Sequence, residues 1–143
     1  MGFNMKVTQK YGYVEFYDKD STETLVEDAV QIFASDYVKY NYPEMVFFHV
    51  VNENKKTIGQ ATKDKAKGLL KGVSDCIFMI PEKCRGKYSF GAIELKRATK
   101  KLATPVSDEQ KSFLKSVRES GGFAAVAYGR DGFLAAFKEM ISK

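Results

Sequence analysis

Residues that build zinc sites and disulfide networks are scarce in this sequence. Its 143 residues include two cysteines, Cys76 and Cys84, and one histidine, His49. This set cannot supply a four-ligand zinc site without carboxylates, and it favours reduced thiols in a cytosolic protein over a disulfide framework. We expect His49, which lies in an apolar stretch, to be packed and hydrogen-bonded rather than catalytic.

Long apolar runs and targeting signals are also missing. No stretch approaches the ~20 apolar residues of a membrane span, and no basic segment followed by an apolar one opens the chain. Gly2 follows Met1 as in myristoylated proteins, but Lys6 stands where that motif needs Ser or Thr. We therefore expect a cytoplasmic protein with no membrane partner.

What the chain does have is a mixed and mildly basic composition. Hydrophobic residues make up 44% and charged residues 29%, which is typical of a globular protein with a real core. The formal net charge is +5, with an isoelectric point of about 9.1. This moderate excess favours a polyanionic partner such as a nucleic acid.

Hydrophobic periodicity predicts alternating helices and strands in one α/β domain over residues 1–143. Residues 1–20 alternate loosely, which indicates a short hairpin or an extended arm. The predicted helices are 23–40, 61–71, 107–119 and 131–142, and the predicted strands are 45–51, 75–80, 88–96 and 123–128. The order predicts a central mixed sheet flanked by helices.

Local residues set the expected boundaries of these elements. We expect the polar cluster 21–24 to cap the first helix, Gly72 to close the second, and Gly121 with Gly122 to stop the third. The strand 45–51 is apolar throughout and predicts a buried position, and 52–56 predicts a polar loop.

Asp75 and the run Glu94-Leu95-Lys96, 19 positions later (94 − 75), are the strongest chemical signal. Because strand side chains alternate between faces, Glu94 and Lys96 share one face while Ile93 and Leu95 share the other. Two carboxylates on neighbouring strands, with a lysine beside them, make a magnesium site suited to a nuclease.

Each of these residues also has an ordinary explanation. A Glu-x-Lys pair is common on solvated strand faces, and a salt bridge from Asp75 to Lys96 would equally explain an acid at the start of a buried strand. Ser107 and Gln110 fit a capping box, although a glutamine at a helix start can also face a site. Glu27 is either a solvent-side charge or an added ligand.

Basic residues gather in two stretches, at 63–71 and at 96–101. The lysines of the first stretch are usually a solvated helix face. Together with Arg97, Lys100 and Lys101, they also suit a rim that binds phosphates, and Lys71 is the member of the first stretch that we assign to it.

The ordered set 72–75, 93–97 and 107–110, with Glu27 upstream, resembles the virus-type replication-repair nuclease (VRR-NUC) domain of the PD-(D/E)XK superfamily. The resemblance covers residues 23–141 and implies a restriction-endonuclease-like core. The isolated Glu-x-Lys is unspecific, and the ordered set is more specific. Residues 1–20 lie outside the resemblance.

The resemblance implies a metal-dependent endonuclease that hydrolyses DNA. Its stand-alone members, often encoded by phages, resemble small homodimers that cut branched DNA such as Holliday junctions. Such a protein would work in the cytoplasm of a bacterial host. The alternatives are a flap or other repair nuclease, or a non-catalytic DNA-binding module on the same fold.

The resemblance also implies roles for individual residues. Asp75, Glu94 and the backbone carbonyl of Leu95 would bind Mg²⁺ or Mn²⁺, with Glu27 as a further ligand. Lys96 would orient or deprotonate the attacking water, and Gln110 would hold a water near the metal.

Overall fold

The fold of the described residues alternates strands and helices, as the sequence predicts. The computed structural model describes residues 4–50, 58–68 and 70–143. The strands are β1 (Lys6–Lys10), β2 (Tyr13–Tyr17), β3 (Val46–His49), β4 (Cys76–Met79), β5 (Phe90–Lys96) and β6 (Phe123–Tyr128). The helices are α1 (Glu27–Asn41), α2 (Ile58–Ala66), α3 (Asp108–Glu119) and α4 (Gly129–Met140), with a short 3-10 turn, η1 (Glu82–Cys84).

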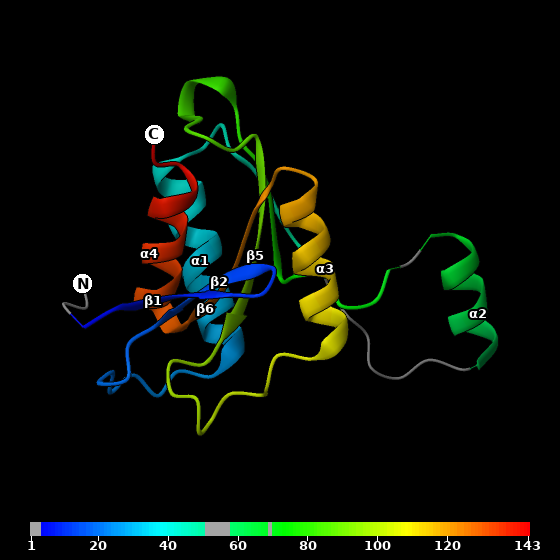
Figure 1. Ribbon diagram of the computed structural model, residues 1–143, viewed down its shortest axis with the longest axis horizontal. Coiled ribbons are helices and arrows are strands. Elements are labelled where there is room, and N and C mark those ends of the chain that lie inside the picture. The colour runs from blue at the N-terminus through cyan, green and yellow to red at the C-terminus, as the bar shows by residue number, and fades with distance from the viewer. Residues whose placement is uncertain (1–3, 51–57, 69) are drawn as a thin grey trace.

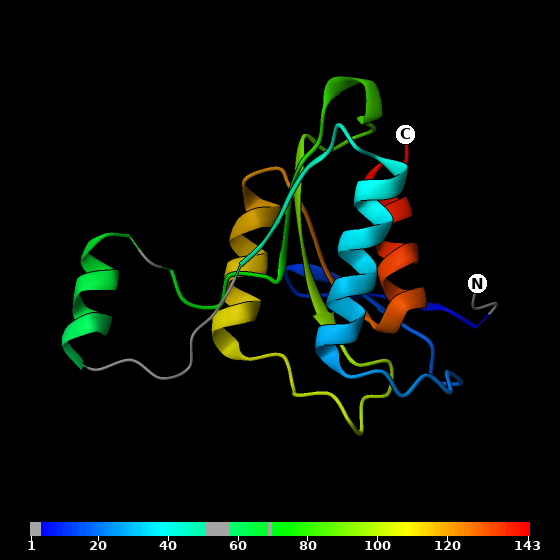
Figure 2. The ribbon, with the colours of Figure 1, turned by 180° about the vertical axis from the view of Figure 1, so that it is seen from behind.

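The six strands form one mixed sheet in the order β1-β2-β6-β5-β4-β3. β6 runs parallel to both β2 and β5, and the other neighbouring pairs are antiparallel. The sheet separates α1 and α4 on one face from α3 on the other, while α2 projects away from the body (Figures 1 and 2). The prediction of an α/β core with a mixed sheet between helices is confirmed.

Two hydrophobic layers lie on the two faces of the sheet. Ile93 and Leu95 belong to the larger layer, which α1 and α4 cover. Ala92 belongs to the smaller layer on the other face, which packs against Leu114 of α3. Since side chains alternate along β5, Glu94 projects towards α3, on the face opposite Ile93 and Leu95.

The prediction of a buried strand at 45–51 is wrong about burial. β3 lies at one edge of the sheet and, among the described strands, pairs only with β4. Phe47 packs against Phe78 on the inner face, with 5.1 Å between ring centroids, but Val46 and Phe48 are exposed. A continuous apolar run does not distinguish an edge strand from a central one, because the neighbours of a strand are a tertiary property.

The predicted start of the first helix at residue 23 is also wrong. α1 begins at Glu27. Its N-cap residue is Val26, whose side chain forms no capping hydrogen bond. Arg130 donates to the Glu23 carboxylate at 2.8 Å, and Arg97 donates to the carbonyl of Leu25 at 3.2 Å. These tertiary contacts involve the segment that would otherwise form the first helical turn.

The bounds of α2 and α4 also differ from the prediction. α2 occupies 58–66, and Gly68 adopts the positive φ of +101° two residues after it, so Gly72 does not close this helix. Gly72 instead lets its backbone approach α3, because an added Cβ would lie 2.3 Å from the Glu109 carbonyl carbon. α4 begins at Gly129 rather than at 131. The predicted loop 52–56 lies outside the described residues.

Candidate metal centre and active site

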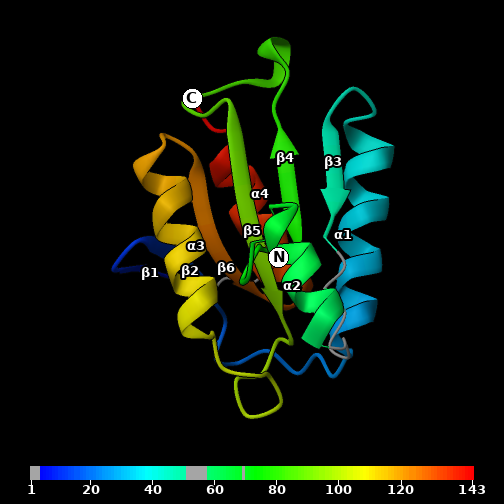
Figure 3. The same ribbon diagram turned by 90° about the vertical axis from the view of Figure 1, so that its right-hand side faces the viewer.

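Three carboxylates from separate parts of the chain meet in one cluster. Glu27 is the first residue of α1, Asp75 precedes β4, and Glu94 lies in β5. Each offers an oxygen atom, and these atoms lie within 4.8 Å of one another. Figure 3 shows that the start of α1 and the end of β5 lie towards the same end of the sheet. The structure thus brings together the three acidic side chains singled out from the sequence.

Strand register explains why Asp75 and Glu94 are neighbours. Cys76 pairs with Ile93 across the antiparallel β4–β5 ladder, so the residue before Cys76 comes level with Glu94. Asp75 Oδ2 accepts a hydrogen bond of 3.0 Å from the Leu95 backbone N–H. This bond fixes the Asp75 carboxylate between the ends of the two strands. Leu95 therefore contributes its backbone to the site, while its side chain lies in the core.

The cluster groups three acidic side chains, of which Glu94 is buried and Glu27 and Asp75 are half-buried. Glu94 is only 2% exposed. Burial, and then the Asp75 carboxylate, raise the pKa of Glu94 to about 9, against the opposing effect of Lys96. Burial, and then Asp75, also raise the pKa of Glu27. Each shift shows that an added positive charge would be favourable at this point.

A divalent cation fits these residues. Glu94 Oε1 is buried and has no hydrogen-bond partner in the described part of the chain, although buried carboxylate oxygens normally have one. Carboxylate oxygens are the ligands that Mg²⁺ and Mn²⁺ prefer. An ion between the three carboxylates would satisfy this atom and offset the repulsion between them.

Lys96 is fully buried beside the cluster. Its ammonium Nζ lies 3.9 Å from Glu94 Oε2, so its ion pair is with Glu94 and not with Asp75 as the alternative interpretation held. Nζ also donates to Thr104 Oγ1 at 3.1 Å and to the Pro105 carbonyl at 3.5 Å. Sequence reasoning gave Thr104 and Pro105 no role, and no periodicity marks them, because they lie in a loop.

Gln110 completes the predicted capping box and also faces Glu94 and Lys96. It completes a capping box: its N–H donates to Ser107 Oγ, and its Oε1 accepts from the Ser107 N–H at 2.9 Å. Its Nε2 donates to Glu94 Oε2 at 3.0 Å, and its Oε1 lies 3.4 Å from Lys96 Nζ. One side chain therefore joins the helix cap to both charged residues of β5.

His49 differs from the expectation of a packed residue. Its side chain is exposed at the end of β3, but it is hydrogen-bonded as predicted. Nδ1 lies 2.9 Å from the Asp75 carbonyl oxygen. Because a carbonyl only accepts, Nδ1 carries the hydrogen in this contact. His49 thereby holds the backbone of an acidic site residue.

Two of the predicted DNA-binding residues make contacts within the protein. Arg97 donates to the carbonyls of Leu25 and Thr24, at 3.2 and 2.9 Å. Lys100 Nζ lies 2.9 Å from a carboxylate oxygen of Glu15. Arg97 thus connects the C-terminal end of β5 to the segment before α1, and Lys100 connects the following loop to β2.

The other two predicted DNA-binding residues, Lys71 and Lys101, are exposed. Lys101 is in the loop after β5, and Lys71 follows α2 shortly before Asp75. The remaining lysines of this stretch, Lys63, Lys65 and Lys67, are also exposed. Exposed basic groups thus lie shortly before Asp75 and shortly after Glu94 in the sequence.

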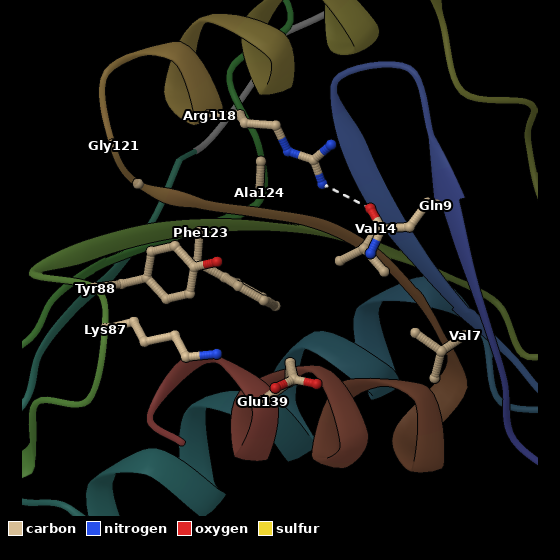
Figure 4. Close-up of a pocket in the computed structure, with 11 residues that line it drawn as sticks. Val7, Gln9, Val14, Lys87, Tyr88, Arg118, Gly121, Phe123, Ala124 and Glu139 are labelled. Carbon is tan, nitrogen blue, oxygen red and sulfur yellow. Dashed lines mark hydrogen bonds between the residues drawn. The ribbon is translucent and has the colours of Figure 1, made fainter. Parts of the chain in front are cut away.

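A separate cavity of about 590 Å³ lies at the N-terminal end of β6, away from the strand end that pairs with Lys96. The β1–β2 hairpin, the start of β6 and the end of α4 enclose it (Figure 4). Phe123 lines this cavity, whereas Lys96 pairs with Tyr128 at the far end of the same strand. Arg118 spans it with a hydrogen bond of 3.3 Å to Gln9. None of the three clustered carboxylates lines this cavity.

Comparison with known families and structures agrees with this geometry. The family model described as the VRR-NUC domain matches residues 21–131. A solved structure titled "VRR_NUC domain protein" is 24% identical, has a TM-score of 0.64, and is matched over 83% of this chain and 90% of its own. At that identity, the second likeness supports the fold alone. No curated protein matches.

The matched segment contains Glu27, Asp75, Glu94, Lys96 and Gln110, and the hairpin β1–β2 lies outside it. In the part of the chain that the structure describes, no helix is long and apolar enough to cross a membrane.

Proposed function

Because the chain belongs to the VRR-NUC family, we propose that it is an endonuclease that hydrolyses phosphodiester bonds in branched DNA. A VRR-NUC domain implies a nuclease that acts on DNA, and nuclease domains of this kind generally use a divalent metal ion. We further propose that the protein requires Mg²⁺ or Mn²⁺, that it cuts as an endonuclease, and that it prefers Holliday junctions. The whole chain, 1–143, would act as one domain.

The observation that carries the proposal is the cluster of Glu27, Asp75 and Glu94, with its unpartnered buried oxygen. Asp75 and Glu94 would hold the ion, helped by the Leu95 carbonyl, and Glu27 would complete the site. When bound, such an ion polarises a phosphate oxygen and lowers the pKa of a coordinated water.

Lys96 would supply positive charge to the reacting phosphate. Its ammonium is preorganised by the contacts to Thr104, Pro105 and Gln110. A fixed, buried charge stabilises developing negative charge more than a mobile one in water, because it needs no reorganisation. We assign Lys96 to orienting the attacking water and to offsetting the charge of the phosphorane-like transition state.

Gln110 would keep the geometry of the site constant. It is anchored on α3 by the capping box and contacts both Glu94 and Lys96. A small displacement of either group costs rate steeply, because proximity and orientation supply much of catalysis. Holding a water near the metal is the further role that we propose for its side chain.

DNA would be bound through its phosphates. The excess of basic residues, +5 overall, favours this, and the exposed Lys71 and Lys101 are the side chains that we assign first to the contact. Arg97 and Lys100 would contribute from positions that their intramolecular partners fix. Branch recognition would rest on shape and phosphate spacing rather than on base sequence. A homodimer would place two sites across one branch point.

The test is cleavage of an end-labelled four-way junction beside matched duplex, flap and single-stranded DNA. Each substrate is incubated with Mg²⁺, with Mn²⁺ or with EDTA, and the Lys96→Ala variant serves as the inactive control. Metal-dependent cutting that favours the junction, and that the variant lacks, supports the proposal. Binding of the junction without any cutting would instead indicate a DNA-binding module, and cutting of flaps alone would indicate a flap nuclease.

A further inference from the structure

The segment 97–107 connects β5 to α3 (Figure 3), and two of its residues contact Lys96. It provides two of the oxygen atoms around Lys96 Nζ, the Thr104 hydroxyl at 3.1 Å and the Pro105 carbonyl at 3.5 Å. The Thr104 contact is the shortest hydrogen bond of the buried ammonium. The loop therefore supplies two of the contacts that surround the positive charge of Lys96, beside those of Glu94 and Gln110.

The same loop is attached to the N-terminal hairpin through a second ion pair. Lys100 Nζ lies 2.9 Å from Glu15 Oε1, and Glu15 is buried in β2 with 7% exposure. The ammonium also lies over the rings of Tyr17 and Tyr128, 4.5 and 5.2 Å from their centroids. The buried Glu15 carboxylate and the two aromatic rings thus hold the otherwise exposed Lys100 side chain against β2 and β6.

A tight turn connects this anchor to Thr104. The Ala103 N–H lies 3.1 Å from the Thr99 carbonyl and 3.3 Å from the Lys100 carbonyl. Thr104 follows directly on Ala103, so this turn connects Lys100 to the residue whose hydroxyl contacts Lys96. A short, continuous series of contacts thus joins Glu15 to the surroundings of Lys96.

Glu15 also lies in register with the site. It pairs with Val126 of β6, and Val126 in turn pairs with Glu94 of β5. Glu15 and Glu94 therefore share one face of the sheet, two strands apart. β2 lies outside the part of the chain that the family model matches.

We propose that Thr104 is a positioning residue for Lys96, and that the Glu15–Lys100 ion pair attaches its loop to the N-terminal hairpin. This inference rests on the proposed function for its effect on cleavage, but its geometric part does not. It gives the hairpin a task beyond extending the sheet, since β2 fixes the loop on which the reactive lysine depends.

The first experiment compares Thr104→Val, which removes only the hydroxyl, with Thr104→Ser, which keeps it. At saturating junction DNA we expect Thr104→Val to lower kcat on the order of tenfold to a hundredfold with little change in KM, since misplacing a reactive group costs rate rather than binding. Thr104→Ser should restore most of the rate. Equal losses in both variants, or a wild-type kcat for Thr104→Val, would overturn the inference.

The second experiment tests the anchor with Lys100→Met and Glu15→Gln. Both should lower kcat, and the double variant should lose less than the product of the two single effects, because they remove one interaction. If Lys100 instead acts only by binding DNA, its loss raises KM, whereas Glu15→Gln, which removes a negative charge, leaves kcat unchanged. That result would refute the anchor.

Lys10→Met is the matched control for Lys100→Met. Lys10 and Lys100 have the same side-chain exposure of 44% and contact the same glutamate, but Lys10 lies 3.9 Å from it and belongs to β1 rather than to the loop. We expect Lys10→Met to leave kcat near that of the wild type. A loss equal to that of Lys100→Met would mean that the charge of Glu15, and not the loop, is what matters.

A readout without catalysis separates this inference from the proposed function. Reductive methylation of the metal-free protein, mapped by mass spectrometry, measures the accessibility of the Lys96 amine. We expect faster modification of Lys96 in Thr104→Val and Lys100→Met, but not in Thr104→Ser or Lys10→Met. Unchanged protection in Thr104→Val would disprove the positioning role, even if the wild type cuts no DNA. A protein that cuts nothing but shows the expected pattern would disprove the nuclease proposal alone.

Discussion

Gln110 and Glu94 are joined by a hydrogen bond of 3.0 Å from the amide nitrogen of the first to a carboxylate oxygen of the second. The amide oxygen of Gln110 meanwhile accepts from the backbone N–H of its own N-cap residue. The amide nitrogen of Gln110 thus contacts the candidate site, while its amide oxygen completes the helix cap. Substitutions can separate these two roles.

Gln110→Glu should lower activity without loosening the helix. A glutamate completes a capping box as well as a glutamine does, so the start of α3 should survive. The new carboxylate, however, donates nothing to Glu94 and repels it. We expect a loss of cleavage rate of at least about tenfold, on the scale of one charged hydrogen bond, with the melting temperature within a few degrees of the wild type.

Ser107→Ala is the reciprocal variant. It removes the N-cap hydroxyl and should cost about 1 kcal/mol of stability, measured by urea unfolding, while the cleavage rate falls far less than in Gln110→Glu. If both variants lose activity and stability in the same proportion, the amide has no separate role in the site.

The metal-free protein should lose stability as the pH rises. The pKa of Glu94 is about 9 in the folded protein and 4.5 as its ordinary value, so the folded state binds more protons than the unfolded state between these limits. The free energy of unfolding therefore falls as the pH rises from about 4.5 to about 9. The fall is at most about 1.4 kcal/mol for each pH unit.

Melting curves in EDTA between pH 5 and pH 9 measure this effect. Glu94→Gln should flatten the profile, whereas Glu109→Gln, at an exposed position in the first turn of α3, should keep the slope of the wild type. A slope that Glu94→Gln leaves unchanged would assign the pH dependence to another group.

Mg²⁺ or Mn²⁺ should stabilise the protein, and more strongly at higher pH, because the ion competes with a proton for Glu94. Binding at a hundredfold excess over Kd adds about 2.7 kcal/mol to the free energy of unfolding. Asp75→Asn should abolish the shift in melting temperature. A full shift in that variant would place the ion elsewhere.

Glu27 has a natural control in its neighbour. Both Glu27 and Asp28 are acidic residues in the first turn of α1, but only Glu27 belongs to the cluster. Glu27→Gln should weaken the metal-induced stabilisation, and Asp28→Asn should not, as calorimetric titration with Mn²⁺ would reveal. Equal effects would mean that Glu27 acts only through general negative charge.

DNA binding should depend on salt through the exposed lysines. Removing a lysine that neutralises one phosphate should reduce the slope of log K against log salt by about 0.9 for duplex arms. We expect this change for Lys71→Ala and for Lys101→Ala in fluorescence anisotropy with a four-way junction. Lys39→Ala, at an exposed position in the last turn of α1, should leave the slope unchanged.

The chemistry of β5 was predictable because a strand has a period of two. Once 88–96 is a strand, the opposite directions of Glu94 and Leu95 follow without any knowledge of the fold. The capping box of Ser107 and Gln110 was also readable, since it is a local pattern. These local rules place the side chains of β5 and the cap of α3, whereas the meeting of Glu27, Asp75 and Glu94 depends on tertiary contacts.

What failed or was missed depends on contacts between distant segments. The exposure of Val46 follows from the edge position of β3, and the late start of α1 accompanies the bonds from Arg97 and Arg130. Thr104 lies in a loop whose course no repeating pattern encodes. Sequence reasoning supplied the carboxylates and the lysine, but not the loop whose Thr104 and Pro105 contact the lysine.

The alternation along β5 also constrains how the chain can misfold. If β5 paired with its neighbours one residue out of register, Glu94 and Lys96 would turn into the apolar layer beneath α1 and α4, and Ile93 and Leu95 would face α3 instead. Two buried charges in that layer would be prohibitively unfavourable. The two charged residues of the candidate site thus also disfavour a misaligned β5, so the strand alignment that is stable is the one that places Glu94 and Lys96 on the α3 side of the sheet.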